Sequence, residues 1–143
     1  MKLMPMGDTG PAMSRENVEL ALRAYDAFNQ RDLDAFLELM DDDVMFESRL
    51  AAMEGGYRGH EGARRWWKDL LDMLPDYTID VEEVRDLGDA TLGRLRARGS
   101  GAASAAPLDE ALWQPGRWRD GKCIWWRNFQ TEAEALEAIE DAE

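Results

Sequence analysis

The chain contains a single histidine, His60, which is its natural candidate for acid–base chemistry because imidazole titrates closest to neutral pH. It follows Gly59 at the start of a predicted helix. The sequence identifies no partner nucleophile and no second ligand for it, which favours a histidine that caps or packs that helix. His60 is therefore a weak catalytic candidate, and the sequence leaves the catalytic residues unknown.

Metal and thiol chemistry have little support in the composition. The chain has one cysteine, Cys123, and one histidine, so it cannot assemble the cysteine and histidine ligands of a usual transition-metal site. One cysteine also excludes an internal disulfide. Cys123 lies within a predicted strand, where a small buried apolar role is commoner than a reactive thiol. We expect no metal and no cofactor.

The overall charge excludes several classes of partner. A net charge of −13 argues against binding to nucleic acid or to an anionic membrane, since both need a basic surface. Arg94, Arg96 and Arg98 alternate along one predicted strand, which favours a solvated or interface face over an anion site. The 143 residues hold no apolar run of membrane-spanning length and no signal-peptide pattern, so we expect a soluble cytoplasmic protein.

The first half of the chain is predicted to be helical. Residues 1–13 have no periodicity and are expected to be a disordered leader, while residues 14–143 form a single domain. Ser14 is the predicted N-cap of the first helix, and Asp32 that of a short second helix. A third helix carries the consecutive Trp66 and Trp67 and ends before Pro75.

The second half is predicted to form strands, dominated by a hairpin from Leu108 to Gln130. Its turn is Asp120-Gly121, a strong hairpin signal between aromatic-rich segments. Pro115 should mark a bulge or an edge, because proline has no N–H to donate. Regular alternation from the turn places Leu112, Gln114, Trp118, Cys123, Trp125 and Phe129 on one face and Trp113, Ile124, Trp126 and Asn128 on the other, unless the turn is bulged.

Large apolar residues on both faces of this hairpin predict that both faces are covered. We expect helices on one face and a second copy of the chain on the other, which is a homodimer through the sheet. Helices followed by strands indicate an α+β domain in which the helices pack on one side of a curved antiparallel sheet. Thr131 and Glu134 form a capping box that opens a short last helix.

Six segments in order carry a resemblance to a known family: Asn29–Ala35, Asp42–Phe46, Tyr57–Gly62, Asp86–Asp89, Arg119–Lys122 and Glu134–Leu136. Together they resemble a SnoaL-like domain of the NTF2-like superfamily over roughly residues 14–140. The resemblance implies a cone-shaped barrel, with a strongly curved antiparallel sheet wrapped around three N-terminal helices and a short C-terminal helix. Its wide end opens as a pocket, and many members pair through their sheets. Members include polyketide cyclases, ketosteroid isomerases and epoxide hydrolases, so the fold does not settle the function.

The ketosteroid isomerase residues implied by the resemblance are absent. Ser48 stands near the position of the base, Ala24 near that of the oxyanion tyrosine and Gln114 near that of the oxyanion carboxyl group. Tyr25 lies one residue after Ala24. A neutral serine cannot accept a proton from a carbon acid near neutral pH, so this activity is disfavoured.

An aromatic-lined pocket is the alternative that the sequence favours. Trp66 and Trp67 point about 100° apart on a helix, so one can line the pocket while the other packs, or both can be core. The predicted pocket residues are Tyr25, Ser48, Tyr57, Trp66, Trp67, Trp113, Gln114 and Asn128. We expect a protein that binds a small hydrophobic or aromatic molecule. An isomerase, polyketide cyclase or hydrolase with an acid–base residue in the pocket stays open, as does an association module whose own side chains fill the cavity.

Overall fold

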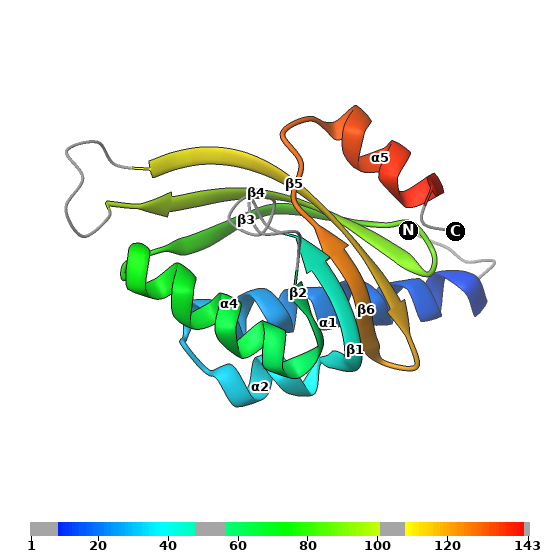
Figure 1. Ribbon diagram of the computed structural model, residues 1–143. Coiled ribbons are helices and arrows are strands. Elements are labelled where there is room, and N and C mark those ends of the chain that lie inside the picture. The colour runs from blue at the N-terminus through cyan, green and yellow to red at the C-terminus, as the bar shows by residue number, and fades with distance from the viewer. Residues whose placement is uncertain (1–8, 48–56, 101–107, 142–143) are drawn as a thin grey trace.

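The structure is a computed structural model that describes residues 9–47, 57–100 and 108–141, with side chains from residue 15 onward. It consists of a six-stranded sheet with three helices on one side and one on the other (Figure 1). The helices are α1 (Thr9–Asn29), α2 (Leu33–Glu38), α4 (Gly59–Met73) and α5 (Glu132–Asp141). The strands are β1 (Met40–Glu47), β2 (Tyr57–Arg58), β3 (Thr78–Asp86), β4 (Ala90–Gly99), β5 (Leu108–Arg119) and β6 (Lys122–Arg127).

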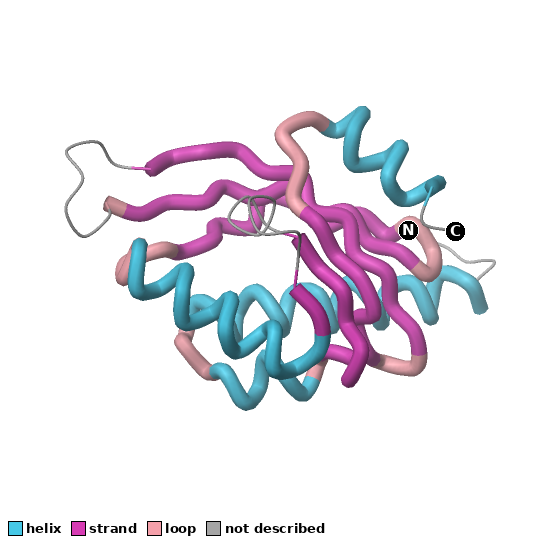
Figure 2. Tube along the Cα trace, viewed as in Figure 1, coloured by secondary structure: helices cyan, strands magenta, loops and turns pink. Residues whose placement is uncertain are grey.

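The sheet has the order β2-β1-β6-β5-β4-β3 and curves around the three N-terminal helices (Figure 2). This confirms the predicted α+β architecture with a short C-terminal helix. One detail differs from the expectation of an antiparallel sheet, because β1 pairs with β6 in parallel. The pairing joins the two halves of the chain, and no short turn signal in the sequence could have indicated it.

Helix α1 begins earlier than the sequence indicated. It starts at Thr9 rather than after Ser14, so residues 9–13 of the predicted leader are helical, while residues 1–8 lie outside the described residues. Leu20, Ala24 and Phe28 recur at helical spacing and are buried against the sheet. In the described structure none of the helices is both long and apolar enough to cross a membrane.

The starts of the next two helices follow from local chemistry. Asp32 caps α2 as predicted, since its carboxylate accepts a hydrogen bond of 3.1 Å from the backbone N–H of Ala35. Helix α4 starts at Gly59, whose φ of +73° and 3.0 Å approach to the Asp42 carbonyl leave no room for a side chain. Helix α4 then directs Trp66 into the molecule.

The outer face of β4 carries the alternating arginines, each of which is paired with an acid. Arg94 lies 3.2 Å from Glu82, Arg96 lies 2.6 Å from Asp109, and Arg98 lies 3.0 Å from Asp80. These partly exposed pairs fit the prediction of a solvated strand face. Strand β3, which supplies two of these acids, has a bulge between Val81 and Glu83.

The aromatic hairpin has the predicted two-residue turn. Asp120 and Gly121 have φ angles of 52° and 79°, and Arg119 lies opposite Lys122. A bulge at Ile124 follows, because Trp118 pairs with Cys123 but Arg117 already pairs with Trp125. Cys123 faces the helices, on the same side as Trp118, as predicted. The predicted faces are wrong beyond Ile124, because Trp126 and Asn128 face the helices and Trp125 faces outward.

Pro115 affects one ladder of β5 and leaves the other intact. It pairs with Leu92 of β4, whereas on the β6 side the pairing passes from Gly116–Trp126 directly to Trp113–Phe129. A missing N–H at Pro115 accounts for the interruption on that side.

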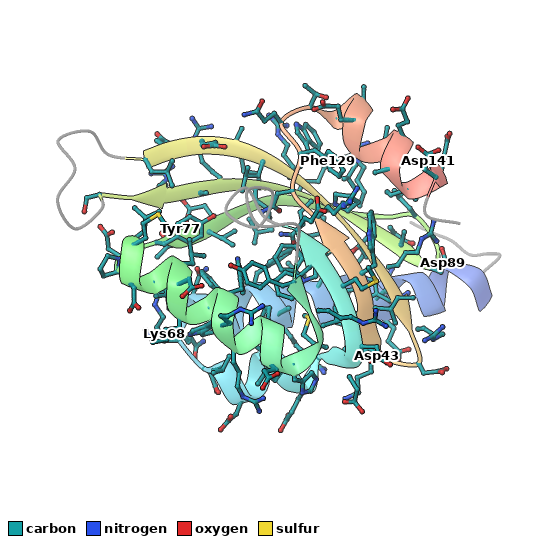
Figure 3. The ribbon with its side chains drawn as sticks, in the orientation of Figure 1. Asp43, Lys68, Tyr77, Asp89, Phe129 and Asp141 are labelled. Carbon is teal, nitrogen blue, oxygen red and sulfur yellow. The ribbon has the colours of Figure 1, made fainter. Side chains whose placement is uncertain are left out.

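Helix α5 lies on the outer side of the sheet, opposite the other helices (Figure 1). Its predicted capping box is present, with the N–H of Glu134 bonded to Thr131 Oγ1 at 3.2 Å. The buried Arg117 of β5 donates to the Ile139 carbonyl and to Asp89 in the β3–β4 turn. Asp89 is labelled near the C-terminal end of α5 in Figure 3.

Candidate functional site

A cavity of about 540 Å³ lies between the helices and the inner face of the sheet. Its size is typical of pockets for small organic molecules. Side chains from α1, α2, α4, β1 and strands β3 to β6 line it. One end lies at the surface, where Met73 is 53% exposed, and the other end is closed by the buried Thr91 and Trp118. Tyr77, labelled in Figure 3, lies where α4 leads into β3 near the surface end.

The walls of this cavity are mainly apolar and aromatic. Phe28 and Phe36 pack on Trp66 with ring centroids 5.7 and 6.0 Å away. Trp126 contacts the same ring edge-on at 5.3 Å. These rings hold one another in place, because offset and edge-to-face contacts have defined geometries. The result is a rigid aromatic wall that suits a flat ligand.

The hydroxyl group of Tyr25 is the most distinctive polar feature of the cavity. Tyr25 is only 8% exposed and lines the hollow from α1. Among the described residues no hydrogen-bond partner of its hydroxyl is found, and the oxygen sits so close to Gly93 that a Cβ there would lie 2.5 Å away. Burial, and to a lesser extent nearby Cys123, raise the pKa of Tyr25. The group therefore stays protonated and is available to donate a hydrogen bond.

Two hydrogen-bonded pairs complete the polar lining. Gln114 Nε2 donates to Asn128 Oδ1 at 2.8 Å, which leaves Gln114 Oε1 as an acceptor and Asn128 Nδ2 as a donor when the amides are oriented by this bond. At the closed end Trp118 Nε1 donates to Thr91 Oγ1 at 3.0 Å. These bonds fix side-chain positions and leave few groups to orient a ligand.

Glu110 contributes a carboxyl group to the cavity. It lies on β5 near the surface end and shares its face with Leu108, Leu112 and Gln114. The sequence did not identify Glu110 as inward-facing, although the alternation along this strand carried the signal. Of the cavity-lining residues that the structure describes, none is a lysine, an arginine or a histidine.

Cys123 lines the cavity as a neutral thiol. Its Sγ lies 3.5 Å from the Trp125 carbonyl oxygen. Burial raises the pKa of Cys123 from 9.0 to about 12. Since Tyr25 and Cys123 are both protonated near neutral pH, neither can act there as a general base.

Four of the eight predicted pocket residues line the cavity: Tyr25, Trp66, Gln114 and Asn128. Ser48 lies outside the described residues. The sequence also did not single out Thr91 or Glu110 as lining residues. Trp126 reaches the cavity only because of the bulge at Ile124.

The other three predicted residues lie elsewhere. Trp67 packs into the core, with its ring centroid 5.1 Å from Phe28, because its direction on α4 differs from that of Trp66. Trp113 lies on the outer face, where the guanidinium groups of Arg85 and Arg94 are each 5.6 Å from its ring. Because successive side chains of a strand point to opposite faces of the sheet, Trp113 points away from the face that carries Gln114.

Tyr57 lines a second hollow of about 320 Å³. Its ring stacks on Phe46 at 5.4 Å, and Phe46 stacks in turn on Trp126 at 4.7 Å. This three-ring stack separates the two hollows. The second one is more polar and includes Arg58, Arg65 and Arg127.

His60 lies outside the lining of the cavity. Its Nε2 is 2.8 Å from the Met40 carbonyl oxygen and 3.8 Å from the exposed carboxylate of Asp42. The contact ties the first turn of α4 to the start of β1, which matches the structural interpretation of this residue. Within the described part of the chain, no three histidine, cysteine or acidic side chains gather as they would around a metal ion.

The sequence matches the SnoaL-like domain over residues 21–126, and the chain belongs to this family. Its fold is similar to that of NTF2-like proteins. No curated protein matches it. An NTF2-like protein of unknown function from Burkholderia pseudomallei has a TM-score of 0.72 and 16% identity, covering 87% of this chain and 97% of that one. TerC co-crystallised with polyporic acid has a TM-score of 0.71 and 20% identity, covering 87% and 98%. IdmH from Streptomyces antibioticus, for which a polyketide cyclase function has been suggested, has a TM-score of 0.68 and 22% identity, covering 86% and 97%.

Proposed function

We propose that this protein binds a small, flat and largely apolar molecule in the cone cavity. The observation that carries the proposal is the buried hydroxyl of Tyr25, which faces an aromatic hollow without a protein partner among the described residues. A hydrogen bond contributes a net stabilisation of about 0.5–1.5 kcal/mol. A ligand that brings an acceptor oxygen to the Tyr25 hydroxyl would gain this free energy on binding.

The shape and polarity of the hollow support the same proposal. An aromatic wall gains most from a planar ring system, through dispersion and edge-to-face contacts. Gln114 Oε1 and Asn128 Nδ2 add one acceptor and one donor. TerC, which has a similar fold, has been co-crystallised with the organic molecule polyporic acid.

Thermal unfolding with a panel of two- and three-ring aromatic compounds, with and without a carbonyl group, tests the proposal. Ligands that bind the folded state raise Tm by mass action. The matched variant is Ala97→Leu, because Ala97 lines the cavity and a larger side chain there fills it. We expect carbonyl-bearing compounds to raise the Tm of the wild type and not that of the variant. Equal shifts in both proteins, or no shift with any compound, would contradict the proposal.

A second candidate is an acid–base enzyme of the isomerase, cyclase or hydrolase kind. Glu110 favours it, because this carboxyl group lines the cavity and could accept a proton. Glu110 and Gln114, however, are four residues apart on β5, which separates them by about 13 Å. Tyr25 lies beside Gly93, the residue paired with Gln114, so an acid and a base do not meet at one point.

The two candidates differ in what Glu110→Gln changes. If the protein is an enzyme of this kind, the variant binds substrate and loses turnover. If the protein is a binding protein, incubation with any compound that raises Tm leaves that compound chemically unchanged, as mass spectrometry would show. Conversion of a ligand by the wild type and not by Glu110→Gln would establish the second candidate.

A further inference from the structure

We infer that the ligand of this cavity presents a cyclic amide edge, whose carbonyl oxygen accepts a hydrogen bond from Tyr25 and whose N–H donates one to Gln114. This inference rests on the proposed function and narrows it to a class of ligand, the neutral fused ring systems that contain a lactam. It depends on polar side chains that meet at one level of the cavity.

The strand register places the Tyr25 hydroxyl beside Gln114. Gly93 of β4 pairs directly with Gln114 of β5, and the hydroxyl oxygen lies 2.5 Å from where a Cβ on Gly93 would be. Cβ positions directly opposite each other on antiparallel strands are about 5 Å apart. The hydroxyl oxygen is therefore within about 8 Å of the Gln114 Cβ, so one small polar group can contact both side chains.

The contact of Gln114 with Asn128 determines which atom of Gln114 is offered to a ligand. Gln114 lies between Asn128, which follows β6, and Gly93 on β4. Its Nε2 donates to Asn128 Oδ1 at 2.8 Å, so Oε1 of the same planar amide is turned away from Asn128. Within the described residues no other bond to Gln114 Oε1 is found. This oxygen is therefore an acceptor for a ligand in the cavity.

One donor beside one acceptor selects the polar group of the ligand. Burial keeps the hydroxyl of Tyr25 protonated by raising its pKa, so this group donates. A lactam carries a carbonyl oxygen and an N–H on adjacent atoms of one ring edge, and both are fixed in direction by the ring. A hydroxy ketone has the same two functions, but its hydroxyl can turn to its own carbonyl group and gains less from Gln114.

Ligand groups that bring only acceptors fit this level less well. A lactone has the shape of a lactam, but its ring oxygen would face Gln114 Oε1 with lone pairs on both sides. A carboxylate would place one of its two acceptor oxygens there. Sites that hydrogen-bond an N–H or O–H of the ligand discriminate against analogues without it, because a polar group of the site then stays unpaired.

The surroundings of this level suit the rest of a fused ring system. The inward neighbours of Gln114 on β5 are Leu112 and Gly116, neither of which has a polar side chain. Trp66 and Trp126, with ring centroids 5.3 Å apart, form part of the wall. A planar lactam can thus bury its apolar edges against these groups while Tyr25 and Gln114 bond to its polar edge.

Isothermal titration calorimetry with two matched pairs of probes tests the inference. The pairs are carbostyril with coumarin, which have two fused rings, and phenanthridinone with benzocoumarin, which have three. In each pair the lactam N–H is replaced by a ring oxygen and the carbonyl group is kept. We expect the lactam to bind the full wild-type chain about tenfold more tightly than its lactone, because one hydrogen bond is gained.

Two variants show which side chain is responsible. Gln114→Leu removes the acceptor with little change of volume, so lactam and lactone should bind equally. Tyr25→Phe should weaken both by the same factor, since both carry the carbonyl group, and should keep their ratio. Gln30→Leu removes an amide from an exposed position of α1 and should change no affinity. A circular-dichroism spectrum and a Tm of each variant confirm that it is folded.

The outcomes separate the inference from the proposed function. If a lactone binds the wild type as tightly as its lactam or more tightly, the inference is wrong and the binding function stands, and this comparison needs no variant. A preference for the lactam that survives in Gln114→Leu also contradicts the inference. If no probe binds while other aromatic carbonyl compounds raise Tm, only the inference fails. If nothing binds, both fail.

Discussion

Tyr25 and Gly93 form a contact that couples the packing of α1 to the chemistry of the cavity. A Cβ at position 93 would lie 2.5 Å from the tyrosine hydroxyl oxygen and 3.4 Å from the carbon that bears it. The absence of a side chain on β4 therefore lets the hydroxyl lie against the sheet. Its oxygen still faces the hollow, where no protein group in the described structure bonds to it.

Tyr25→Phe should separate binding from stability. The variant loses only a hydroxyl that has no protein partner, so the free energy of unfolding should stay within about 0.5 kcal/mol of the wild type or rise. Affinity for a carbonyl-bearing ligand should fall about tenfold, because one hydrogen bond is lost. Urea unfolding and calorimetric titration measure the two quantities. A large loss of stability would show that the hydroxyl is satisfied within the protein.

Gly93→Ala should act through the same contact. The added methyl group overlaps the Tyr25 hydroxyl, and overpacking of this kind costs about 1–3 kcal/mol. In a Tyr25→Phe background the nearest ring atom is 3.4 Å away, so the substitution should cost less. A double-mutant cycle in urea measures the coupling between the two sites. Additive costs would contradict a direct clash.

Cys123 should make the protein less stable at alkaline pH. Its pKa is raised from 9.0 to about 12 by burial, so above pH 9 the unfolded chain releases a proton that the folded chain retains. Stability is therefore fully present below pH 9 and falls as the pH rises toward 12. Burial raises the pKa of Tyr25 in the same direction. Cys123→Ala should flatten the fall in Tm above pH 9, and an unchanged profile would exclude this cause.

At the scale of elements, Asn29 joins the end of α1 to strand β3. Its Nδ2 donates to the Ile79 carbonyl at 2.7 Å, and its Oδ1 accepts from the Ile79 N–H at 2.9 Å. The amide thus satisfies both backbone groups of one residue, as a neighbouring strand would. This clamp fixes the angle at which α1 crosses the sheet.

Asn29→Ala should destabilise the fold by about 2 kcal/mol, since two buried backbone groups lose their partners. Gln30→Ala is the matched control, because the exposed Gln30 bonds only to Asp26 four residues earlier. It should change stability by less than about 0.5 kcal/mol. Equal effects of the two substitutions in urea unfolding would contradict the clamp.

The elements that the sequence predicted correctly are those with local causes. Asp32 caps α2, Asp120 and Gly121 form the hairpin turn, and Thr131 caps α5, because each feature depends on residues only a few positions apart. The parallel pairing of β1 with β6 depends on contacts between distant segments. The bulge at Ile124 depends on how β6 fits between β1 and β5, and strict alternation could not show it.

The site was predictable to the extent that alternation holds. Gln114 was placed correctly, and the same alternation on β5 would have placed Glu110. Trp126 was placed on the wrong face because of the bulge. Whether Trp66 or Trp67 lines the cavity depends on the rotation of α4 about its axis, which packing against Phe28 and Phe36 decides.

At the scale of the whole molecule, we propose that the outer face of the sheet pairs with a second copy of the chain. Helix α5 covers only part of this face. The rest carries arginine–acid pairs around the partly buried Trp113. A face on which positive and negative side chains alternate can be electrostatically complementary to the same face of a second copy across a two-fold axis.

Analytical ultracentrifugation tests this pairing. We expect a dimer for the wild type and a monomer for Trp113→Glu, because the substitution places a charge in the centre of the proposed interface. Leu87→Glu is the control, since Leu87 is 39% exposed in the β3–β4 turn. A monomeric wild type, or a dimer that persists in Trp113→Glu, would exclude this interface.

The aromatic wall has an optical consequence. Trp66, Trp118 and Trp126 line the hollow, and Trp66 lies within edge-to-face distance of Trp126 at 5.3 Å. A molecule that enters the hollow lies against indole rings whose emission depends on local polarity and on energy transfer to a neighbouring chromophore. The chain thus contains its own fluorophores at the place where a ligand would bind, and occupancy could be followed by its intrinsic emission without any added label.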